Sequence, residues 1–579
     1  MLALTAPAVG ILLAFVLGGR RVNMLVCGSF AAGLAIAATI LGEVWRNGRP
    51  LVYLVGGFEP PLGIALRADS ISAVMLTVIA LVMCAVGWFA WRDFAQPAGQ
   101  SEARGPLTFW VLMLSVWCAL NAVMLGTDLF NLYVALELLT FAAVPLVSLS
   151  GKAETTRAAL RYLLFALIGS VLYLLGAALL YGGYGTLDML LLAARIKPEP
   201  VALAAAALMT IGLLAKTALF PLHLWLPPAH AGAPPAGSAV LSALVVKGSL
   251  LIVVRLWFEA MAGLMTFAAA QILAALGTGA IVFGSIVALR QVRLKMLIAY
   301  STLAQIGFMF LMLPLAFDAS VGRMQSGAAL TGGVLQVISH ATAKAAMFMS
   351  AGVIYASLGH DRVAGLGGLW RVAPLAVLAF ALGGIALTGL VPSGAYLAKD
   401  LLLRAADETG QPWLTLVVEA SGMFTSSYLI LVLAHIFFPG RKLVGTKVTE
   451  RYAEAVPAVA LALLSLLVGF VPWDVHLLGP VDGTHFATSS SALVKSIGTL
   501  IAGALLAIVL RRVSSPTDGT GRQGGPVSRN WKAVRHAFGA IEWLNSQSQR
   551  WPTAMLFLLA LGIIFLLALF GNGGSAGLS

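Results

Sequence analysis

Apolar stretches of about 20 residues, each long enough to cross the hydrocarbon core of a bilayer, recur along the whole chain. Hydrophobic residues make up 60% of the sequence and charged residues only 10%, whereas a soluble protein carries about 25% charged residues. A chain of 579 residues with this composition cannot hide its apolar surface in a soluble fold. The sequence therefore predicts an all-α, polytopic membrane protein.

Glycine, proline and charged residues divide the apolar stretches into sixteen predicted helices, and we expect about 14 to 16 of them to span the membrane. The first stretch is followed by Arg20 and Arg21, without a cleavage site, which indicates a retained helix rather than a signal peptide. The polar linker at 514–551 predicts a short amphipathic helix that lies on the membrane surface and contacts a neighbouring subunit. The predicted helices cover residues 3–19, 22–42, 70–91, 107–125, 129–149, 159–182, 201–222, 237–258, 264–289, 294–315, 329–357, 372–404, 412–438, 455–472, 493–510 and 552–570.

The basic residues are distributed unevenly between the two sides of this helix map. When alternate loops are assigned to opposite sides, 23 of the 36 Lys and Arg residues fall on one side and 8 on the other. The positive-inside rule makes the richer side cytoplasmic, so both termini are predicted to be periplasmic in a bacterial inner membrane. The same bias explains the net charge of +13, which in a soluble chain would suggest a nucleic-acid partner; we predict none here.

Five basic residues remain inside predicted helices: Lys216, Lys247, Arg255, Lys344 and Lys399. Arg255 lies near a helix end, where its side chain is expected to snorkel to the interface. Each of the four lysines costs at least about 2.5 kcal/mol at the bilayer centre, so each is a candidate functional residue. The matching acid is the carboxylate at position 137, inside the fifth predicted helix.

Two predicted helices are interrupted by proline and glycine, and each carries one of the lysines. Pro221 follows Lys216, and Pro392 precedes Lys399. Proline removes a backbone hydrogen bond and breaks a helix, and paired interruptions of this kind indicate an inverted-repeat transporter. The predicted repeats are helices 4–8 and 9–13. The corresponding divisions are 1–105 for the first three helices, 106–260 and 261–440 for the two repeats, and 441–579 for the last three helices with their linker.

Several motifs in residues 60–440 resemble a known family. They are NLYVALELLTFAAVPL, AKTALFPLHLWLPPAHAGAPPAGSAVLSALVVKG, LKMLIAYSTLAQIGFMF, SHATAKAAMFMSAGVIY, GLGGLWRVAP and TGLVPSGAYLAKDLLL. This set is similar to the antiporter-like subunits of respiratory complex I, which are shared with Mrp-type cation/proton antiporters and membrane-bound hydrogenases. Gln291 and Val292 stand where the family often has an acid before the tenth helix, so one cytoplasmic loop contact is not expected here.

The resemblance implies a proton pathway along the middle of the membrane. Its first half consists of Glu137, which resembles the fifth-helix glutamate of the family, and Lys216, which resembles the lysine that pairs with it. Lys247 resembles the connecting lysine of the eighth helix. His223 and His230 match family positions that border the broken helix.

The second half of the implied pathway begins at the eleventh helix. His340 and Lys344 resemble a relay there, and their spacing of four residues places them on one helix face. Lys399 resembles the terminal residue of the second half-channel. We interpret the other membrane histidine, His435, as a core residue, together with His476 and His485.

These residues suggest a switch. A lysine in a dry helix bundle favours its neutral form, and an adjacent carboxylate reverses that preference. A Glu137–Lys216 ion pair would therefore hold a proton on Lys216, and weakening of the pair would release it towards Lys247.

The sequence contains no nucleotide fingerprint, haem ligand pair or cysteine cluster, since Cys27, Cys84 and Cys118 are isolated. We predict no cofactor, no metal and no redox centre on this chain. The resemblance favours a proton-translocating subunit of a complex I-like or hydrogenase assembly, with homologous and smaller membrane subunits as partners.

Three alternatives stay open: the D-type subunit of an Mrp Na⁺/H⁺ antiporter, the membrane partner of a proton-driven inorganic-carbon uptake complex, and a non-transporting structural subunit. The buried lysines argue against the structural subunit. Whether protons or Na⁺ move is left open.

Overall fold

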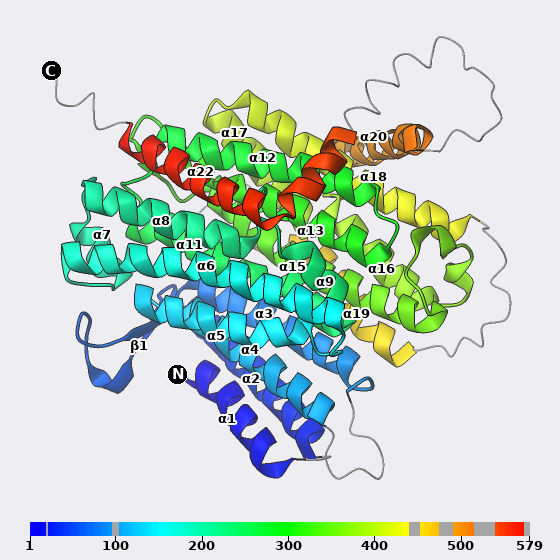
Figure 1. Ribbon diagram of the computed structural model, residues 1–579, viewed down its shortest axis with the longest axis horizontal. Helices are drawn as coiled ribbons and strands as arrows, with labels where there is room; N and C mark the ends of the chain where they lie inside the picture. The colour runs from blue at the N-terminus through cyan, green and yellow to red at the C-terminus, as the bar shows by residue number, and fades with distance from the viewer. Residues whose placement is uncertain (19–20, 95–103, 439–451, 474–489, 515–538, 572–579) are drawn as a thin grey trace.

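The computed structural model describes residues 1–18, 21–94, 104–438, 452–473, 490–514 and 539–571, and α-helices dominate it (Figure 1). Thirteen helical segments in this described part are long and apolar enough to cross a membrane, and three shorter apolar helices accompany them. The chain is therefore a multi-pass, all-α membrane protein, as the sequence predicts.

Within the residues that the structure describes, the first half of the chain contains eleven α-helices. They are α1 (Leu2–Leu17), α2 (Arg21–Asn47), α3 (Ser70–Ala90), α4 (Arg104–Leu125), α5 (Leu129–Val147), α6 (Ala153–Tyr184), α7 (Met189–Arg195), α8 (Pro200–Thr217), α9 (Leu226–Gly232), α10 (Pro235–Val240) and α11 (Val246–Arg255). Two π-helical segments, η2 (Leu241–Val245) and η3 (Leu256–Ala260), continue α10 and α11 into one membrane-crossing segment.

The second half is also helical within the described residues. Its α-helices are α12 (Phe267–Leu289), α13 (Leu294–Phe310), α14 (Met312–Leu315), α15 (Ala328–Leu358), α16 (Pro374–Leu387), α17 (Gly394–Glu408), α18 (Pro412–Phe437), α19 (Tyr452–Leu467), α20 (Ser490–Ser514) and α22 (Trp551–Phe570). Short 3₁₀ turns are η1 (Val55–Gly57), η4 (Val363–Gly365), η5 (Leu369–Arg371) and η6 (Val468–Phe470).

Two small antiparallel hairpins connect helices. In the first, β1 (Leu51–Leu54) pairs with β2 (Ala65–Ala68), with Leu51 opposite Ala68. In the second, β3 (Phe317–Asp318) pairs with β4 (Arg323–Met324). The sequence analysis predicted neither hairpin, because both lie in connections between apolar stretches.

All sixteen predicted segments coincide with a described apolar helix, but two of them needed correction. The predicted helix 201–222 stops earlier, because α8 ends at Thr217 and α9 starts at Leu226. The predicted helix 372–404 is two helices, α16 and α17, which are separated by residues 388–393.

Both interruptions contain the prolines singled out in the sequence, and both lie close to a lysine. Pro221 follows the left-handed residue Ala218 (φ 60°), and Lys216 is in the last turn of α8. Pro392 precedes α17, which Ser393 caps by accepting from the Tyr396 amide at 3.1 Å. Each break therefore places a helix end beside a cationic side chain. The division of the chain into two inverted repeats stays a prediction.

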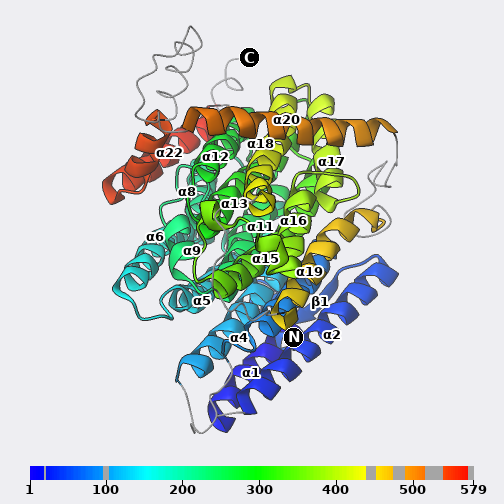
Figure 2. The ribbon, with the colours of Figure 1, turned by 90° about the vertical axis from the view of Figure 1, so that its right-hand side faces the viewer.

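Two helical segments form the interior of the molecule. α15 packs against α3, α10, α13, α16, α17 and α19, and Figure 2 shows it between α1, α2 and α4 at one end and α20 at the other. The best membrane-crossing windows of α15 and of the α10–η3 segment are completely buried inside this single chain. The lysines of these two segments, Lys247 and Lys344, are therefore almost completely buried.

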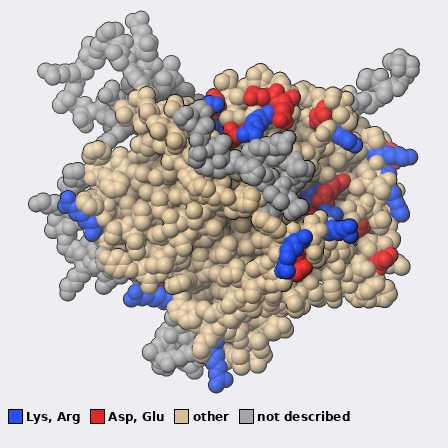
Figure 3. Space-filling view, turned by 180° about the vertical axis from the view of Figure 1, so that it is seen from behind, with Lys and Arg blue, Asp and Glu red and all other residues tan. Residues whose placement is uncertain are grey.

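The surface agrees with insertion in a bilayer. Figure 3 shows a broad area without charged side chains across the middle of one face, with most charged residues towards its margins. A charge in contact with lipid tails is costly, so an uncharged band is what the hydrocarbon region requires.

The C-terminal segment packs on its own chain. Residues 539–548 are helical, as the amphipathic pattern predicts, while 515–538 lie outside the described residues. Glu542 pairs with Arg290 at 2.6 Å, and the Tyr300 hydroxyl donates to Asn545 at 3.1 Å. These contacts dock the segment on α13 and the end of α12. Contact with a neighbouring subunit stays a prediction.

Close approach of α6 and α8 depends on a pair of glycines. A Cβ atom added to Gly169 would lie 2.6 Å from the Gly212 carbonyl oxygen, and one added to Gly212 would lie 2.3 Å from the Gly169 carbonyl oxygen. Small residues at such points let membrane helices pack backbone to backbone. This packing brings Ser170 of α6 towards Lys216 of α8, so it shapes the site described below.

We predict that Gly212→Val separates α6 from α8 and lowers stability by about 1–3 kcal/mol, the usual cost of overpacking. Thermal unfolding of the purified complex in detergent measures this change. The control is Gly182→Val on α6, the other helix of the pair, with no atom within 4 Å of the added Cβ. Equal melting temperatures for the two variants would contradict the packing argument.

Candidate functional site

The site is a series of titratable side chains that lie inside the helical bundle on α5, α8, α11, α15 and α17. The structure divides them into four polar centres, each held by different helices. We describe them from the N-terminal half towards the C-terminal half.

The first centre is an ion pair between α5 and α8. Lys216 Nζ lies 3.0 Å from Glu137 Oε1 and also donates to Thr140 Oγ1 at 3.0 Å. The Glu137 side chain is 13% exposed and that of Lys216 is 5% exposed. The Ser170 hydroxyl of α6 donates to the same carboxylate oxygen. Because Lys216 is in the last turn of α8, the negative end of the helix dipole also favours its charge.

The second centre joins the two buried segments. Lys247 Nζ of α11 lies 2.7 Å from His340 Nδ1 of α15 and donates to the Ser242 carbonyl oxygen. Both side chains are almost completely buried. At this distance the two nitrogens form a hydrogen bond, in which one of them donates a proton and the other accepts it.

The third centre is one helical turn from the second. Lys344 of α15 is completely buried and donates to Ser301 Oγ and, at 3.3 Å, to the Ile298 carbonyl oxygen of α13. His340 and Lys344 therefore do lie on one face of α15, as their spacing predicts.

The fourth centre surrounds Lys399 on α17. The charged groups that face it are Glu419 of α18 and Lys495 of α20. A small cavity of about 10 Å³ lies beside it, about the room needed for one water molecule. Gln305 and Gln336 line the other side of this cavity.

Hydroxyl and amide groups lie between the four centres. Thr217 donates to Ser249 at 2.9 Å and so links the end of α8 with α11, two residues from Lys247. Gln336 donates to Gln305 at 2.6 Å, and Gln305 donates to Thr425 at 3.0 Å. The first contact joins α8 to α11, and the second and third join α15 to α13 and α18, beside the cavity that Lys399 also lines.

The two histidines beside the broken helix have different surroundings. His223 packs between Phe220 and Phe283, with ring centroids 5.6 and 5.1 Å away. His230 stacks on Phe348 at 4.8 Å, and neither of its ring nitrogens has a hydrogen-bond partner among the described residues. Lys247, Lys295 and Lys344 are the charged groups that face it. His230 thus lies near the centres on α11 and α15, whereas His223 has an aromatic environment.

Several polar residues of the site were missed in the sequence analysis. Glu419 is an acid inside a predicted helix, and counting acids as well as bases would have found it. Ser170, Thr140 and Ser301 gave no signal, since hydroxyl side chains are common in membrane helices. His435 is partly exposed, and its Nδ1 is 2.7 Å from the Leu431 carbonyl oxygen of its own helix, so its interpretation as a core residue stays a prediction. His476 and His485 lie outside the described residues.

Arg255 does not snorkel as predicted. Its guanidinium is buried and donates to the carbonyl oxygens of Gly126 and Met124 and to Asp69. Within the part of the chain that the structure describes, no three His, Cys, Asp or Glu side chains gather as a metal-binding group. The absence of a cofactor stays a prediction.

Comparison with known proteins gives consistent matches. The family model described as "NADH:quinone oxidoreductase/Mrp antiporter, TM" matches residues 126–425. NADH-quinone oxidoreductase subunit N of Desulforudis audaxviator is 32% identical, with 76% of this chain and 87% of that protein covered. The D subunit of a Na⁺/H⁺ antiporter of Bacillus subtilis is 26% identical, with 76% and 86% covered.

A solved structure has the same fold. A chain of the membrane-bound sulfane sulfur reductase, an archaeal respiratory membrane complex, is 26% identical and superposes with a TM-score of 0.72. The match covers 88% of this chain and 98% of that chain.

The ion pair of the first centre can be tested by stability. Glu137→Gln leaves the buried Lys216 ammonium without its carboxylate, and breaking a buried pair costs about 3–5 kcal/mol. We expect a lower melting temperature for this variant and recovery in the double variant Glu137→Gln, Lys216→Met, which has no unpaired charge. Glu199→Gln, at an exposed carboxylate, is the control. A double variant as unstable as the single one would contradict the pairing.

Proposed function

We propose that this chain moves protons along its buried line of titratable groups. The chain belongs to the NADH:quinone oxidoreductase/Mrp antiporter family of membrane subunits. The chain is an antiporter-like membrane subunit. In the proposed pathway the stations run from Glu137 and Lys216, through Lys247, His340 and Lys344, to Lys399.

The contact between Lys247 and His340 is the observation that supports this proposal most strongly. A lysine and a histidine 2.7 Å apart in a completely buried place have little structural use, because apolar side chains would pack there at lower cost. The same geometry suits proton transfer, which needs donor and acceptor within hydrogen-bond reach. Histidine is also the side chain whose two nitrogens can take a proton on one side and release it on the other.

The first centre is the proposed switch. While Glu137 faces Lys216, the carboxylate stabilises the ammonium and the proton stays. When Glu137 turns away, the cation loses its counter-ion in a dry site and releases its proton. The next station along the chain is Lys247 of α11, the helix that Thr217, next to Lys216, contacts through Ser249.

Water completes the proposed path where side chains do not touch. His340 Nε2 and Gln336 Oε1 are buried atoms without a hydrogen-bond partner among the described residues. Buried polar atoms are normally satisfied, so each is a natural attachment point for a water molecule. The small cavity lined by Gln336 and Lys399 is another place where a water molecule fits.

We further propose that the chain works in a complex I-like or hydrogenase assembly with homologous and smaller membrane subunits, in a bacterial inner membrane with both termini periplasmic. The higher identity to an NADH-quinone oxidoreductase subunit N supports this choice. The second candidate is the D-type subunit of an Mrp Na⁺/H⁺ antiporter, which the Bacillus subtilis relative supports. The fold similarity to the sulfane sulfur reductase chain adds other respiratory complexes to the assemblies in which we propose that this chain works. As the membrane partner of an inorganic-carbon uptake complex, the remaining alternative, this chain would need a soluble subunit different from those of a respiratory complex.

The pathway predicts the effect of removing its first centre. Glu137→Ala and Lys216→Ala should each lower proton movement by about 10²-fold, as loss of a proton-transferring group does. The assay follows a pH-sensitive dye in everted membrane vesicles that contain the assembled complex, whose amount is checked by immunoblot. Lys152→Ala, at the exposed start of α6, should be unchanged. Full proton movement by either centre variant would rule out the pathway.

The far end of the pathway gives a separate prediction. Lys399→Ala should abolish proton movement, and Glu419→Gln should reduce it, because Glu419 is the acid that faces this lysine. Two assays on the same vesicles identify the driving force. In one, an electron donor and quinone are added, and in the other a Na⁺ gradient is imposed across the membrane. A Glu419→Gln variant with wild-type rates under both conditions would remove that residue from the pathway.

A further inference from the structure

The proposed path from Lys344 to Lys399 has to cross between two helices. Lys344 of α15 donates to Ser301 and Ile298 of α13. Lys399 of α17 lines the small cavity, whose wall also comes from α13, α15, α16 and α18. Because α18 packs against both α13 and α17, its side chains are placed to connect the surroundings of the two lysines.

One side of α18 carries three residues that lie between these lysines. Gly422, Thr425 and Tyr428 follow one another at intervals of three residues, so they are neighbours on the helix surface. At Gly422 the Lys399 ammonium lies against the helix backbone, since an added Cβ atom would be 3.2 Å from Nζ. The glycine therefore leaves the room that the ammonium occupies.

Thr425 carries the first hydroxyl beyond Lys399 on this side of α18. It lines the same cavity as the lysine, which has room for about one water molecule. Its Oγ1 accepts from the Gln305 amide at 3.0 Å and donates to the Ser421 carbonyl oxygen at 2.9 Å. Gln305 accepts in turn from Gln336 at 2.6 Å. The two amides thus hold the threonine hydroxyl at the cavity wall.

Tyr428 follows Thr425 and is the residue that the four centres do not account for. Its side chain is 1% exposed, and the polar groups that face its hydroxyl are Ser301, Gln305 and Thr425. No hydrogen bond of ordinary geometry holds this hydroxyl among the described residues. Buried polar groups are normally satisfied, and phenylalanine would fill the same space without burying a hydroxyl. The position of the hydroxyl therefore points to a use other than packing.

Ser301 completes the connection to Lys344. Its hydroxyl accepts from the Lys344 ammonium and donates to the Ile298 carbonyl oxygen at 2.9 Å. A hydroxyl accepts one hydrogen bond while it donates another, and its O–H bond can rotate. When the Ser301 O–H bond turns from Ile298 to Tyr428, a series of hydroxyls runs from Lys344 to the cavity beside Lys399.

We propose that the Tyr428 hydroxyl relays protons between Lys344 and Lys399 along this side of α18. The inference rests on the proposed function. One proton leaves Lys344 Nζ for the Ser301 oxygen while the proton of the serine passes to the Tyr428 oxygen. The phenol proton passes to Thr425 Oγ1, and the proton of the threonine reaches the neutral Lys399 amine through a water molecule in the cavity. Each hydroxyl gains one proton and loses one, so none is left charged.

Tyr428→Phe tests the relay, because it removes the hydroxyl and keeps the ring. In everted vesicles that contain the assembled complex, proton movement should fall by about 10²-fold. The melting temperature of the purified complex should not change, since no hydrogen bond is lost. Tyr173→Phe is the matched control, at a buried tyrosine of α6 whose hydroxyl donates to the Leu129 carbonyl oxygen at 3.1 Å, and it should transport normally. Wild-type proton movement by Tyr428→Phe would overturn the relay.

A pair of substitutions at Thr425 separates a relay from a packing role. Thr425→Val keeps the shape and loses the hydroxyl, whereas Thr425→Ser keeps the hydroxyl in a smaller side chain. Proton movement should fall in the valine variant and be regained in the serine variant. Ser426→Ala is the control on the next residue, whose hydroxyl donates to the Gly422 carbonyl oxygen at 2.9 Å, and it should be unchanged. An active valine variant beside a slow serine variant would show a packing role and contradict the relay.

The outcomes separate this inference from the function it rests on. If Tyr428→Phe and Thr425→Val behave as wild type while Lys399→Ala is inactive, protons reach Lys399 by another route and the proposed function stands. If Lys216→Ala and Lys399→Ala are both fully active, the proposed function falls and the relay falls with it. If Tyr428→Phe also lowers the melting temperature, the two Thr425 variants decide.

Discussion

The Lys247–His340 contact is the interaction on which the rest of the site depends. Both residues belong to helical segments whose membrane-crossing windows are completely buried, so neither can move its charge to water by snorkelling. An ammonium in such a place needs acceptors, and the structure supplies His340 Nδ1 and the Ser242 carbonyl oxygen. Lys344 repeats the arrangement one turn away with Ser301. Each buried ammonium is therefore stabilised by its hydrogen-bond partners, and in the proposed path a proton that leaves one lysine changes the hydrogen bonding around it.

The broken helices make such stations tolerable inside a bilayer. A regular helix satisfies its own backbone groups and offers nothing to a neighbouring charge, whereas a helix end leaves carbonyl groups free. Lys216 is in the last turn of α8, where carbonyl groups are free. Lys399 is near the N-terminal end of α17, and the free carbonyl groups that face it belong to the end of α16, since its side chain lies beside Gly389. The proline at each break thus fixes where a helix end occurs, and the close packing of Gly169 against Gly212 fixes which hydroxyl meets the resulting ion pair.

The sequence predicted the charges of the site better than their surroundings, for a physical reason. Lys216, Lys247, Lys344 and Lys399 are conspicuous because an apolar helix rarely contains a lysine. Ser170 and Gln336 are not, because such side chains occur on any face of a membrane helix and only packing decides what they touch. Asp69, which accepts from Arg255, escaped notice for another reason: it lies just outside the predicted helices, where charged residues are expected. The snorkelling predicted for Arg255 failed because the ends of α3 and α4 offer it better acceptors than the interface does.

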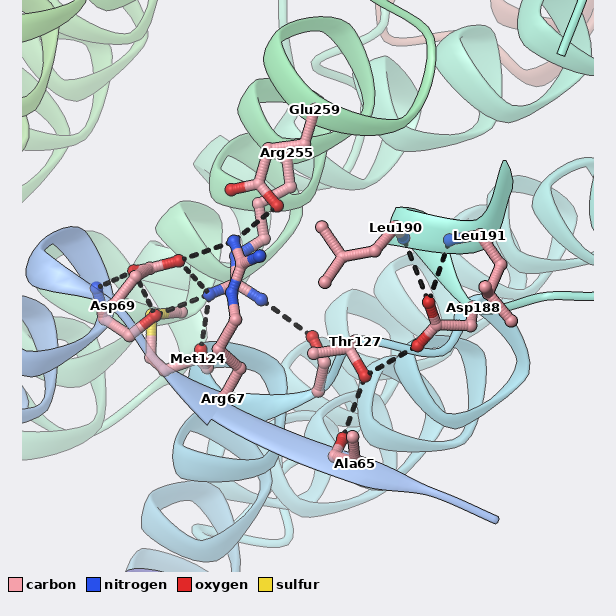
Figure 4. Close-up of polar contacts among 12 residues, drawn as sticks. Ala65, Arg67, Asp69, Met124, Thr127, Asp188, Leu190, Leu191, Arg255 and Glu259 are labelled. Atoms are coloured by element: carbon pink, nitrogen blue, oxygen red, sulfur yellow. Dashed lines mark hydrogen bonds and ion pairs between the residues drawn. The ribbon is translucent and has the colours of Figure 1, made fainter. Parts of the chain in front are cut away.

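The ion pairs at the C-terminal end of α11 and the buried lysines handle charge in opposite ways. In the chain Glu259–Arg67–Asp69–Arg255, two arginines and two carboxylates neutralise one another (Figure 4). Along the path the lysines outnumber the acids, which are Glu137 at one end and Glu419 at the other. Two ammonium groups roughly 8 Å apart repel by about 2 kcal/mol at an effective dielectric constant of about 20, so neighbouring lysines in the middle resist being charged together. In the proposed path, protons are therefore held most firmly beside the carboxylates.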